Sequence, residues 1–427
     1  MSEAPNTRAV GSRPRRRGRL WLGRALLVLI SLGLAGGVAE LVLRGLGYTA
    51  IYAVYSRPSI LWRHDPLLGW HHEPNTADRY VGPRPWPIEF ETEIAINSLG
   101  LRGPEIEPVP EGGKRVLFLG DSVVAGFEVE QDETFVARTG ERLTRTLGYP
   151  VQSLNGGVRG YGTDQTYLWY REHGKQLAPD WVVFVHAAND PRNNMTLHRM
   201  RRPFGKAAFS LDEGGELDLV GAPVQPYPLC SHWAFNANFQ PTRHDGWMAR
   251  SYCWIETHLT DHSALFTWIT FRVRENSWLL HKIWYWAVPD GIERVARWFV
   301  PGVAHAANGG DPNFDASSYR LTSRLIEALA REVRSGGGRL LIVVRESELE
   351  RMDAPAIHAE GARTIALAVT PEQARGRPIR FENDGHLNAL GHRIASRLLA
   401  EAIRRELVAE PAASGQSATG VIVDQSS

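Results

Sequence analysis

Residues 116–126 read VLFLGDSVVAG, and the pattern of this segment indicates an α/β fold. The four apolar residues 116–119 are typical of a short strand that is buried on both faces. Gly120 ends the strand, and Asp121-Ser122 stands ahead of a segment, 132–147, whose apolar residues have helical spacing. Strand, polar turn and helix in this order form the repeating unit of an α/β fold, in which catalytic groups gather at the carboxyl ends of strands.

The same rhythm recurs along the body of the chain, on both sides of one interruption. Further short apolar runs stand at 151–154, 181–185, 340–344 and 364–369, and helical patterns at 163–173, 319–333 and 387–408. Short apolar strands separated by helices predict a mostly parallel sheet with helices on both faces. We expect the two parts of this domain at 113–190 and 319–408.

The interruption is a Trp-rich insert, residues 191–318. Residues 192–315 hold eight of the 14 Trp of the chain, and several of these lie in a stretch with helical spacing, 261–299. We therefore expect a helical insert. Its aromatic side chains would form a core of their own, contact the acyl chains or sugar rings of a ligand, or lie at a membrane surface.

The N-terminus has the pattern of a membrane anchor. Residues 1–24 hold seven Arg and one acid, and an uncharged segment follows at 25–39. With the apolar residues after Glu40 it extends to residue 43, and a segment over 25–43 is long enough to cross a membrane. The positive-inside rule then places the basic tail in the cytoplasm and the body outside. A cleaved signal peptide has the same parts, and either reading exports the body.

Cysteine content and charge limit the other classes of site. In an exported body Cys230 and Cys253 could form a disulfide, and the alternative is two buried thiols. Outside residues 1–24 the chain carries 41 basic and 46 acidic residues, so we expect no binding of nucleic acid. No group of Cys and His has the spacing of a zinc site, and His71-His72 is expected at the surface.

Two further segments flank the α/β domain. Residues 44–112 form an N-terminal extension. Within it, residues 88–96 alternate side chains suited to a buried face, most of them apolar, with mostly acidic side chains. This alternation predicts a half-buried strand with an acidic outer face, and a turn is expected at 97–100. The last segment, 409–427, is rich in Ser, Gly and Ala, and we expect it to be disordered.

Polar segments accompany the other strands and the last helix. Residues 155–163 are rich in glycine, which lets a backbone approach a ligand closely, and Asn189 follows the third strand. Asp384 and His386 precede the last helix. Each alone has an ordinary structural explanation, such as a turn or a helix cap. Their order, each after a strand or before a helix, favours one shared site at an edge of the sheet.

In this combination the sequence resembles the SGNH hydrolases, also called the GDSL esterase/lipase superfamily. Gly120-Asp121-Ser122 is similar to the family's first block, which carries the nucleophile. Gly160 is similar to the glycine of the second block and Asn189 to the asparagine of the third. Asp384 and His386 resemble the last block, which carries the acid and the base.

The resemblance covers about residues 113–190 and 320–407 and leaves out the Trp-rich insert. Ala187 stands where the third block usually has Gly, which is a small change. Residues 97–103, NSLGLRG, also resemble a segment that precedes this domain in membrane-anchored bacterial members. The resemblance implies a flavodoxin-like three-layer α/β/α sandwich with a mostly parallel sheet.

The resemblance also implies a serine-hydrolase mechanism. Ser122 would be the nucleophile, His386 the base, and Asp384 the group that orients the imidazole. The backbone N–H groups of Ser122 and Gly160 and the side-chain amide of Asn189 would form the oxyanion hole. No metal or cofactor is implied.

We therefore expect an extracytoplasmic serine esterase whose substrate is an acylated carbohydrate or a lipid. One helix would hold it in the bacterial inner membrane, with the catalytic domain in the periplasm or outside, unless signal cleavage releases it. An O-acyltransferase that modifies a cell-envelope polysaccharide would use the same triad and is the alternative. A non-catalytic envelope-binding module is the third possibility.

Overall fold

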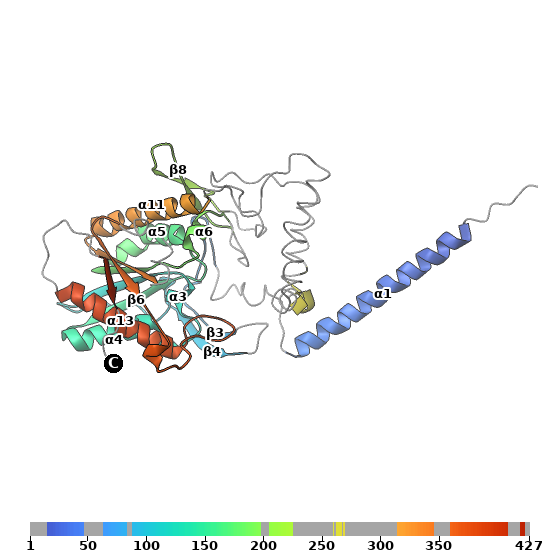
Figure 1. Ribbon diagram of the computed structural model, residues 1–427, viewed down its shortest axis with the longest axis horizontal. Coiled ribbons are helices and arrows are strands. Elements are labelled where there is room, and N and C mark those ends of the chain that lie inside the picture. The colour runs from blue at the N-terminus through green and yellow to red at the C-terminus, as the bar shows by residue number, and fades with distance from the viewer. Residues whose placement is uncertain are drawn as a thin grey trace, which may run out of the picture.

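A computed structural model gives the architecture of the chain (Figure 1). It describes residues 15–46, 63–82, 88–197, 205–224, 259, 262–266, 268–269, 314–345, 359–408 and 419–422.

The main sheet lies at the centre of the body and, within the described residues, has six parallel strands. They are β5 (Lys114–Gly120), β6 (Val151–Gly157), β7 (Trp181–Val185), β10 (Arg339–Arg345), β11 (Ala362–Leu367) and β12 (Thr419–Ile422). Their order is β12-β11-β10-β7-β5-β6, with every pair parallel. The predicted parallel sheet is confirmed. The chain runs outward from β5 to β6 and then returns to β7, so the carboxyl ends of β5 and β7 flank a topological switch point, where such sheets bind ligands.

Helices cover both faces of this sheet, as the sequence predicted. On one face lie α4 (Phe135–Leu147) and α13 (Ala389–Val408), and on the other α5 (Thr163–Glu172) and α11 (Phe314–Ser335) (Figure 1). Side chains of β5 alternate between the two resulting cores. Val116 and Phe118 belong to the core that includes α4 and α13, whereas Leu117 and Leu119 belong to the core that includes α5 and α11. The result is a three-layer α/β/α sandwich.

The N-terminal extension contributes two small antiparallel hairpins. One pairs β1 (Arg63–Asp65) with β2 (Gly69–His71), and the other pairs β3 (Thr76–Gly82) with β4 (Phe90–Ile96). In β4 the side chains alternate strictly between buried and exposed, which confirms the predicted half-buried strand with its acidic outer face. The predicted turn follows it.

The predicted membrane helix is longer than its apolar segment. Helix α1 (Arg15–Gly45) includes the basic residues that precede the apolar run, and Figure 1 shows it extending away from the body. Residues Gly23–Gly45 are long and apolar enough to cross a membrane, and none of that window is buried. Glu40, which interrupts the apolar run, accepts hydrogen bonds from Ser263 Oγ and from the backbone N–H groups of Ala264 and Leu265 at 2.7–2.9 Å.

The structure differs from the sequence predictions at three places. The insert contains a hairpin of β8 (Ala208–Leu211) and β9 (Leu217–Val220), because a turn with a positive φ at Gly215 joins two short alternating segments. Strand β12 lies within the tail that was expected to be disordered, where the sequence Thr-Gly-Val-Ile favours extended backbone. His71 and His72 are buried rather than exposed, with their rings stacked 5.6 Å apart.

The remaining predictions for the insert lie outside the described residues. These include the helical stretch over 270–299, most of the insert's Trp residues, and the disulfide between Cys230 and Cys253.

Candidate active site

The position of Ser122 follows from a sharp turn at the end of the central strand. Gly120 has a φ of 152°, and a Cβ there would lie 2.8 Å from both the Val185 carbonyl oxygen and a Val124 methyl group. Only glycine tolerates this conformation and this closeness. The Asp121 carboxylate then accepts a hydrogen bond of 2.9 Å from the Val123 N–H and begins the short helix α3 (Ser122–Ala125). Ser122 is thereby held, partly exposed, at the carboxyl end of β5.

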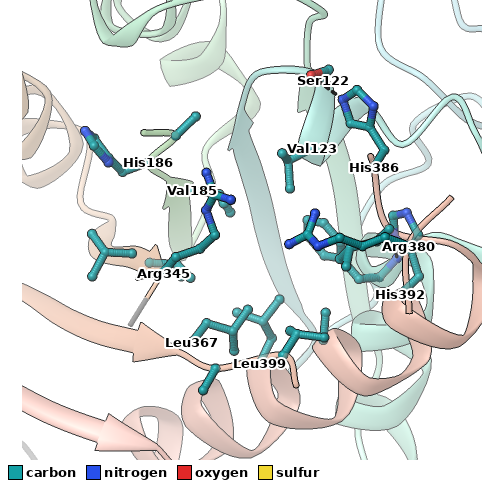
Figure 2. Close-up of a pocket in the computed structure, with 18 of the residues that line it drawn as sticks. Ser122, Val123, Val185, His186, Arg345, Leu367, Arg380, His386, His392 and Leu399 are labelled. Atoms are coloured by element: carbon teal, nitrogen blue, oxygen red, sulfur yellow. Dashed lines mark hydrogen bonds between the residues drawn. The ribbon is translucent and has the colours of Figure 1, made fainter. Parts of the chain in front are cut away.

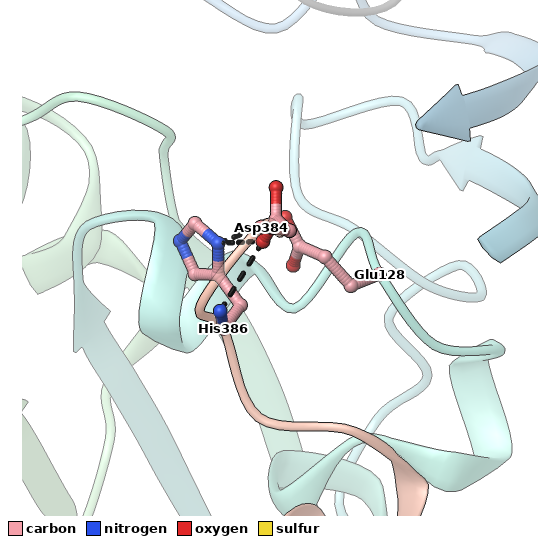
Figure 3. A group of neighbouring side chains, drawn as sticks. All are labelled: Glu128, Asp384 and His386. Atoms are coloured by element: carbon pink, nitrogen blue, oxygen red, sulfur yellow. Dashed lines mark hydrogen bonds and ion pairs between the residues drawn. The ribbon is translucent and has the colours of Figure 1, made fainter. Parts of the chain in front are cut away.

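His386 and Asp384 reach Ser122 from the loop ahead of α13. His386 Nε2 lies 2.8 Å from Ser122 Oγ, within hydrogen-bond distance (Figure 2). On the other side of the ring, His386 Nδ1 is hydrogen-bonded to Asp384 Oδ1 (Figure 3). The structure thus brings together the three residues that the sequence predicted as nucleophile, base and acid, although 264 positions separate the serine from the histidine.

The N-terminal extension holds this loop in place. The carboxylate of Glu89 accepts hydrogen bonds from the backbone N–H groups of Glu382, Asn383 and Asp384, at 2.8, 3.0 and 3.2 Å. One residue further along, the Phe90 ring meets the Phe381 ring edge-on, with centroids 5.1 Å apart. A segment far from the loop in sequence therefore fixes the backbone that carries the candidate acid and base.

The surrounding charges suit His386 to act as a base. Burial by itself would lower the pKa of His386, but the nearby Glu128 and Asp384 carboxylates outweigh it and raise the pKa above its ordinary value. Burial would raise the pKa of Asp384, but its hydrogen bond with His386 and the positive charges of His386 and Arg159 hold that pKa below its ordinary value. Asp384 is therefore ionised at neutral pH and can stabilise an imidazolium at His386.

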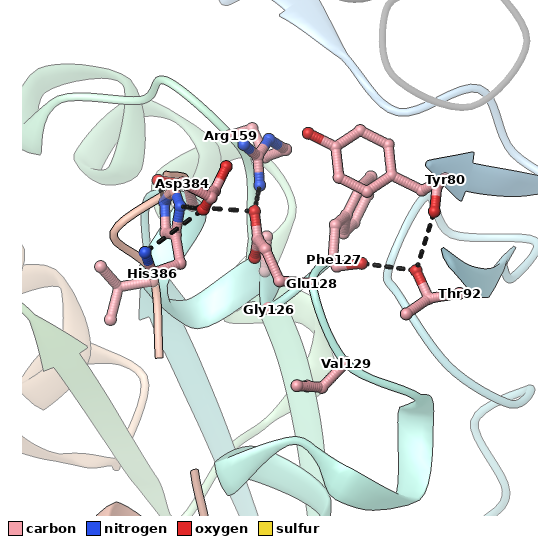
Figure 4. A network of polar contacts seen from close by, with 12 residues as sticks. Tyr80, Thr92, Gly126, Phe127, Glu128, Val129, Arg159, Asp384 and His386 are labelled. Carbon is pink, nitrogen blue, oxygen red and sulfur yellow. Dashed lines mark hydrogen bonds and ion pairs between the residues drawn. The ribbon is translucent and has the colours of Figure 1, made fainter. Parts of the chain in front are cut away.

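Glu128 and Arg159 are parts of the site that the sequence reasoning missed. They form a buried ion pair, with 0% of the Glu128 side chain and 7% of the Arg159 side chain exposed (Figure 4). Glu128 Oε1 lies 3.4 Å from His386 Nδ1, so the imidazole has a second carboxylate beside it. A carboxylate between two aromatic or aliphatic neighbours, in Phe127-Glu128-Val129, was the available signal in the sequence.

The same three groups could offer ligands to a metal ion. One atom each from Glu128, Asp384 and His386 lies within 4.8 Å of the other two. The Arg159 guanidinium already neutralises Glu128, and His386 Nδ1 is hydrogen-bonded to Asp384, so the donor set is engaged in an ion-pair and hydrogen-bond network. A guanidinium beside the site opposes a cation, and we interpret the cluster as a proton-handling network.

A cavity of about 260 Å³ lies beside Ser122 (Figure 2). Val185, Leu367 and Leu399 give it an apolar wall between the sheet and α13, and Arg345 and Arg380 reach into it. Such a cavity accommodates a small or medium apolar group next to the Ser122 hydroxyl.

The two remaining predicted oxyanion-hole residues follow β6 and β7, the two strands that pair with β5 in the sheet. Gly160 follows β6 in a tight turn, in which the Tyr161 N–H donates to the Val158 carbonyl, and its φ of 87° favours glycine. Asn189 follows β7 and precedes α6 (Asp190–Asn194). Neither is among the described residues that line the cavity, and their roles stay predictions.

Comparison with known proteins is consistent with this geometry. Residues 118–221 match the model of the GDSL-like lipase/acylhydrolase family, a range that contains Ser122, Gly160 and Asn189 and ends before Asp384. This part of the chain belongs to the GDSL-like lipase/acylhydrolase family. The segment that carries Ser122 is thus similar to a family of carboxylic ester hydrolases. No curated relative matches the sequence.

Solved structures that are similar to this chain, all at low identity, include two esterases and one hydrolase. A mutant acetyl-xylooligosaccharide esterase from Geobacillus has 12% identity and a TM-score of 0.32, over 71% of this chain and 97% of that one. A mutant acetyl xylan esterase from Geobacillus stearothermophilus has 11% identity and a TM-score of 0.32, over 70% and 97%. An α/β hydrolase from the metagenome of Lake Arreo, Spain, has 10% identity and a TM-score of 0.31, over 68% and 95%. These values are too low to transfer a substrate to this chain.

Proposed function

We propose that this chain is an extracytoplasmic serine esterase that cleaves carboxylic esters through an acyl-enzyme on Ser122. The observation that carries the proposal is the continuous chain of contacts from Ser122 Oγ to His386 Nε2, and from His386 Nδ1 to Asp384. A serine hydroxyl is a weak nucleophile until an adjacent base takes its proton, and this chain supplies the base and the group that orients it.

The reaction would proceed in two halves. First, Ser122 Oγ attacks the ester carbonyl carbon while its proton passes to His386 Nε2. The tetrahedral intermediate then expels the alcohol, which takes that proton from His386, and the acyl group stays on Ser122. In the second half His386 removes a proton from water, the hydroxide attacks the acyl carbon, and the carboxylic acid leaves as Ser122 regains its proton. Asp384 stabilises the imidazolium in both halves.

Negative charge on the carbonyl oxygen needs its own donors. We assign the backbone N–H groups of Ser122 and Gly160 and the side-chain amide of Asn189 to this role, on the family resemblance and on their positions after β5, β6 and β7. Loss of one such donor typically costs about 2.7–4 kcal/mol of transition-state stabilisation.

The substrate would be an acylated carbohydrate or a lipid ester. The apolar wall of the cavity beside Ser122 supports an acyl group as the part that enters it. We further infer that α1 anchors the enzyme in the bacterial inner membrane with its basic end in the cytoplasm, so that the body acts in the periplasm or outside.

Hydrolysis of p-nitrophenyl acetate by the full-length chain in detergent, beside Ser122→Ala, tests the proposal. We expect the substitution to reduce kcat/KM by about 10³-fold or more, because the nucleophile is removed. A matched control is Ser335→Ala, which removes an exposed hydroxyl at the end of α11 and should keep the wild-type rate. Equal rates for Ser122→Ala and wild type would refute the assignment.

The same assay separates hydrolysis from acyl transfer. If the enzyme is an esterase, adding a sugar acceptor should not change the products, which remain the free acid and p-nitrophenol. An acylated sugar as the main product would instead favour the O-acyltransferase, which uses the same catalytic residues.

A further inference from the structure

Glu128 lies beside His386, the candidate base, and folding stability alone does not explain this position. Its side chain is fully buried, and its Oε1 lies 3.4 Å from His386 Nδ1, the nitrogen that is already hydrogen-bonded to Asp384 (Figure 3). Two carboxylates therefore face one ring nitrogen. Glu128 Oε2 is also buried and has no hydrogen-bond partner among the described residues. An arrangement selected for stability alone would satisfy that oxygen, because a buried polar atom without a partner costs free energy.

The carboxylate of Glu128 is held through Arg159. Arg159 forms the buried ion pair with Oε1, and its guanidinium lies over the rings of Tyr80 and Phe127, 5.1 and 5.9 Å from their centroids (Figure 4). These contacts fix the guanidinium, and through it the carboxylate.

The backbone on both sides of Glu128 is fixed as well. The buried guanidinium of Arg102 donates hydrogen bonds to the Ala125 carbonyl at 2.8 Å and to the Val129 carbonyl at 2.6 Å. Arg102 belongs to the segment 97–103, which the sequence singled out ahead of the α/β domain. The segment 97–103 therefore fixes the loop that places Glu128 beside His386.

The other charged groups near His386 complete its environment. Asp384 is in direct contact with it, and Arg159 lies behind both carboxylates. His392, on α13, is buried, and burial with the charge of Arg102 lowers its pKa to about 3, so it stays neutral. Two negative charges and one positive charge thus act on the imidazole.

We propose that Glu128 is a positioning residue for His386: a second carboxylate that, together with Asp384, orients the imidazole and stabilises its protonated form, while the ion pair with Arg159 holds Glu128 in place. The inference rests on the proposed function, because it concerns the same base. When Ser122 gives its proton to His386 Nε2, the imidazolium keeps its Nδ1–H between the two carboxylates. Removing the Glu128 charge then raises the energy of every step in which the imidazolium exists.

The test is the reaction of full-length Glu128→Gln with a fluorophosphonate probe, followed by intact and peptide mass as a function of pH. Gln keeps the size of the side chain and removes its charge. We expect the acidic limb of the labelling profile to move to lower pH, because the base loses a negative neighbour, and the plateau rate to fall by about tenfold or more. With p-nitrophenyl acetate, kcat should fall and KM should stay near the wild-type value.

The control is Asp132→Asn, which removes an exposed carboxylate four residues away and should keep both the plateau and the profile. The outcomes distinguish a failure of the proposed esterase function from a failure of the role of Glu128. Wild-type enzyme that is not labelled on Ser122 contradicts the proposed function. Wild type labelled on Ser122, with a Glu128→Gln plateau and profile equal to it, overturns the role of Glu128 alone.

A second variant covers the case in which Glu128→Gln does not fold, since it leaves Arg159 buried without its partner. Glu128→Asp keeps the negative charge near Arg159 but draws the carboxylate back from His386 by one methylene group. We expect a folded protein with a lowered plateau. A wild-type plateau and profile in this variant would overturn the positioning role.

Discussion

Around His386, single residues set the proton affinity on which the proposed chemistry depends. The imidazole is mostly buried, which disfavours its charged form, yet Glu128 and Asp384 more than compensate and raise its pKa. The ring can therefore accept the Ser122 proton more readily than an isolated histidine would. This balance depends on Arg159, which allows a second carboxylate to be buried at the site.

The raised pKa of His386 predicts an alkaline shift of the acidic limb. Only neutral His386 can act as a base, and it becomes protonated as the pH falls through its pKa. Because that pKa lies above the ordinary value of about 6.5, kcat/KM should begin to fall at a higher pH than an unperturbed histidine would give. A kcat/KM profile for p-nitrophenyl acetate measures this limb. A midpoint clearly below the ordinary histidine value would contradict the electrostatic account.

At the level of elements, strand β4 and the residue before it connect the N-terminal extension to the catalytic loop. Glu89 accepts hydrogen bonds from three backbone N–H groups of the loop that carries Asp384 and His386, and Phe90 packs on the same loop. A carboxylate that accepts several backbone N–H bonds is a strong local constraint, because hydrogen bonds to a charged group are about twice as strong as neutral ones. The extension is thus a part of the site and more than a linker to the membrane helix.

We expect Glu89→Ala to lower kcat by about tenfold, because loss of roughly 1.5 kcal/mol of charged hydrogen bonding loosens the loop. Thermal unfolding should change little, since Glu89 is only partly buried. Glu91→Ala, two residues further along, is the matched control: the Glu91 carboxylate faces solvent, so this substitution should leave kcat unchanged. A Glu89→Ala enzyme with wild-type kcat would show that the loop holds its geometry without this contact.

The sequence predicted those elements whose pattern is local. The apolar strands around Ser122, the alternation of β4 and the helices on both faces depend on neighbours along the chain, and the structure agrees with them. Ser122, Asp384 and His386 were found because the family motif surrounds each of them. Glu128 was not, because its burial depends on Arg159 and on packing with the extension. The hairpin β8-β9 was not predicted, because each of its strands has only four residues and such short segments carry little alternation.

At the scale of the whole molecule, the apolar helix α1 is joined to the insert by hydrogen bonds of Glu40 and of Arg44, whose guanidinium donates to the His262 carbonyl at 2.8 Å. Glu40 interrupts the apolar run of α1, and its carboxylate accepts hydrogen bonds from Ser263, Ala264 and Leu265 of the insert. A carboxylate within the hydrocarbon core of a membrane is costly. Glu40 and the residues it binds are therefore expected at the non-cytoplasmic surface of the membrane that α1 crosses. The body would then lie close to the bilayer.

This arrangement predicts that the C-terminus lies outside the cytoplasm. Alkaline phosphatase fused after residue 427 should be active in bacterial cells, because the phosphatase folds only after export. The fusion protein should also sediment with membranes. Deleting residues 15–46 removes α1 and should abolish both properties. An inactive full-length fusion would place the body in the cytoplasm, and an active fusion released from the membranes would favour signal cleavage.

The central claim is that an acyl group passes through Ser122, and the most direct measurement is to trap it. Full-length enzyme would be mixed with p-nitrophenyl acetate, quenched in acid within the first turnovers, digested, and examined by peptide mass. Our account predicts one added acetyl group on the peptide that contains Ser122, absent from Ser122→Ala and from His386→Gln. An acetyl group found on another residue during turnover, or turnover that persists in Ser122→Ala, would contradict it.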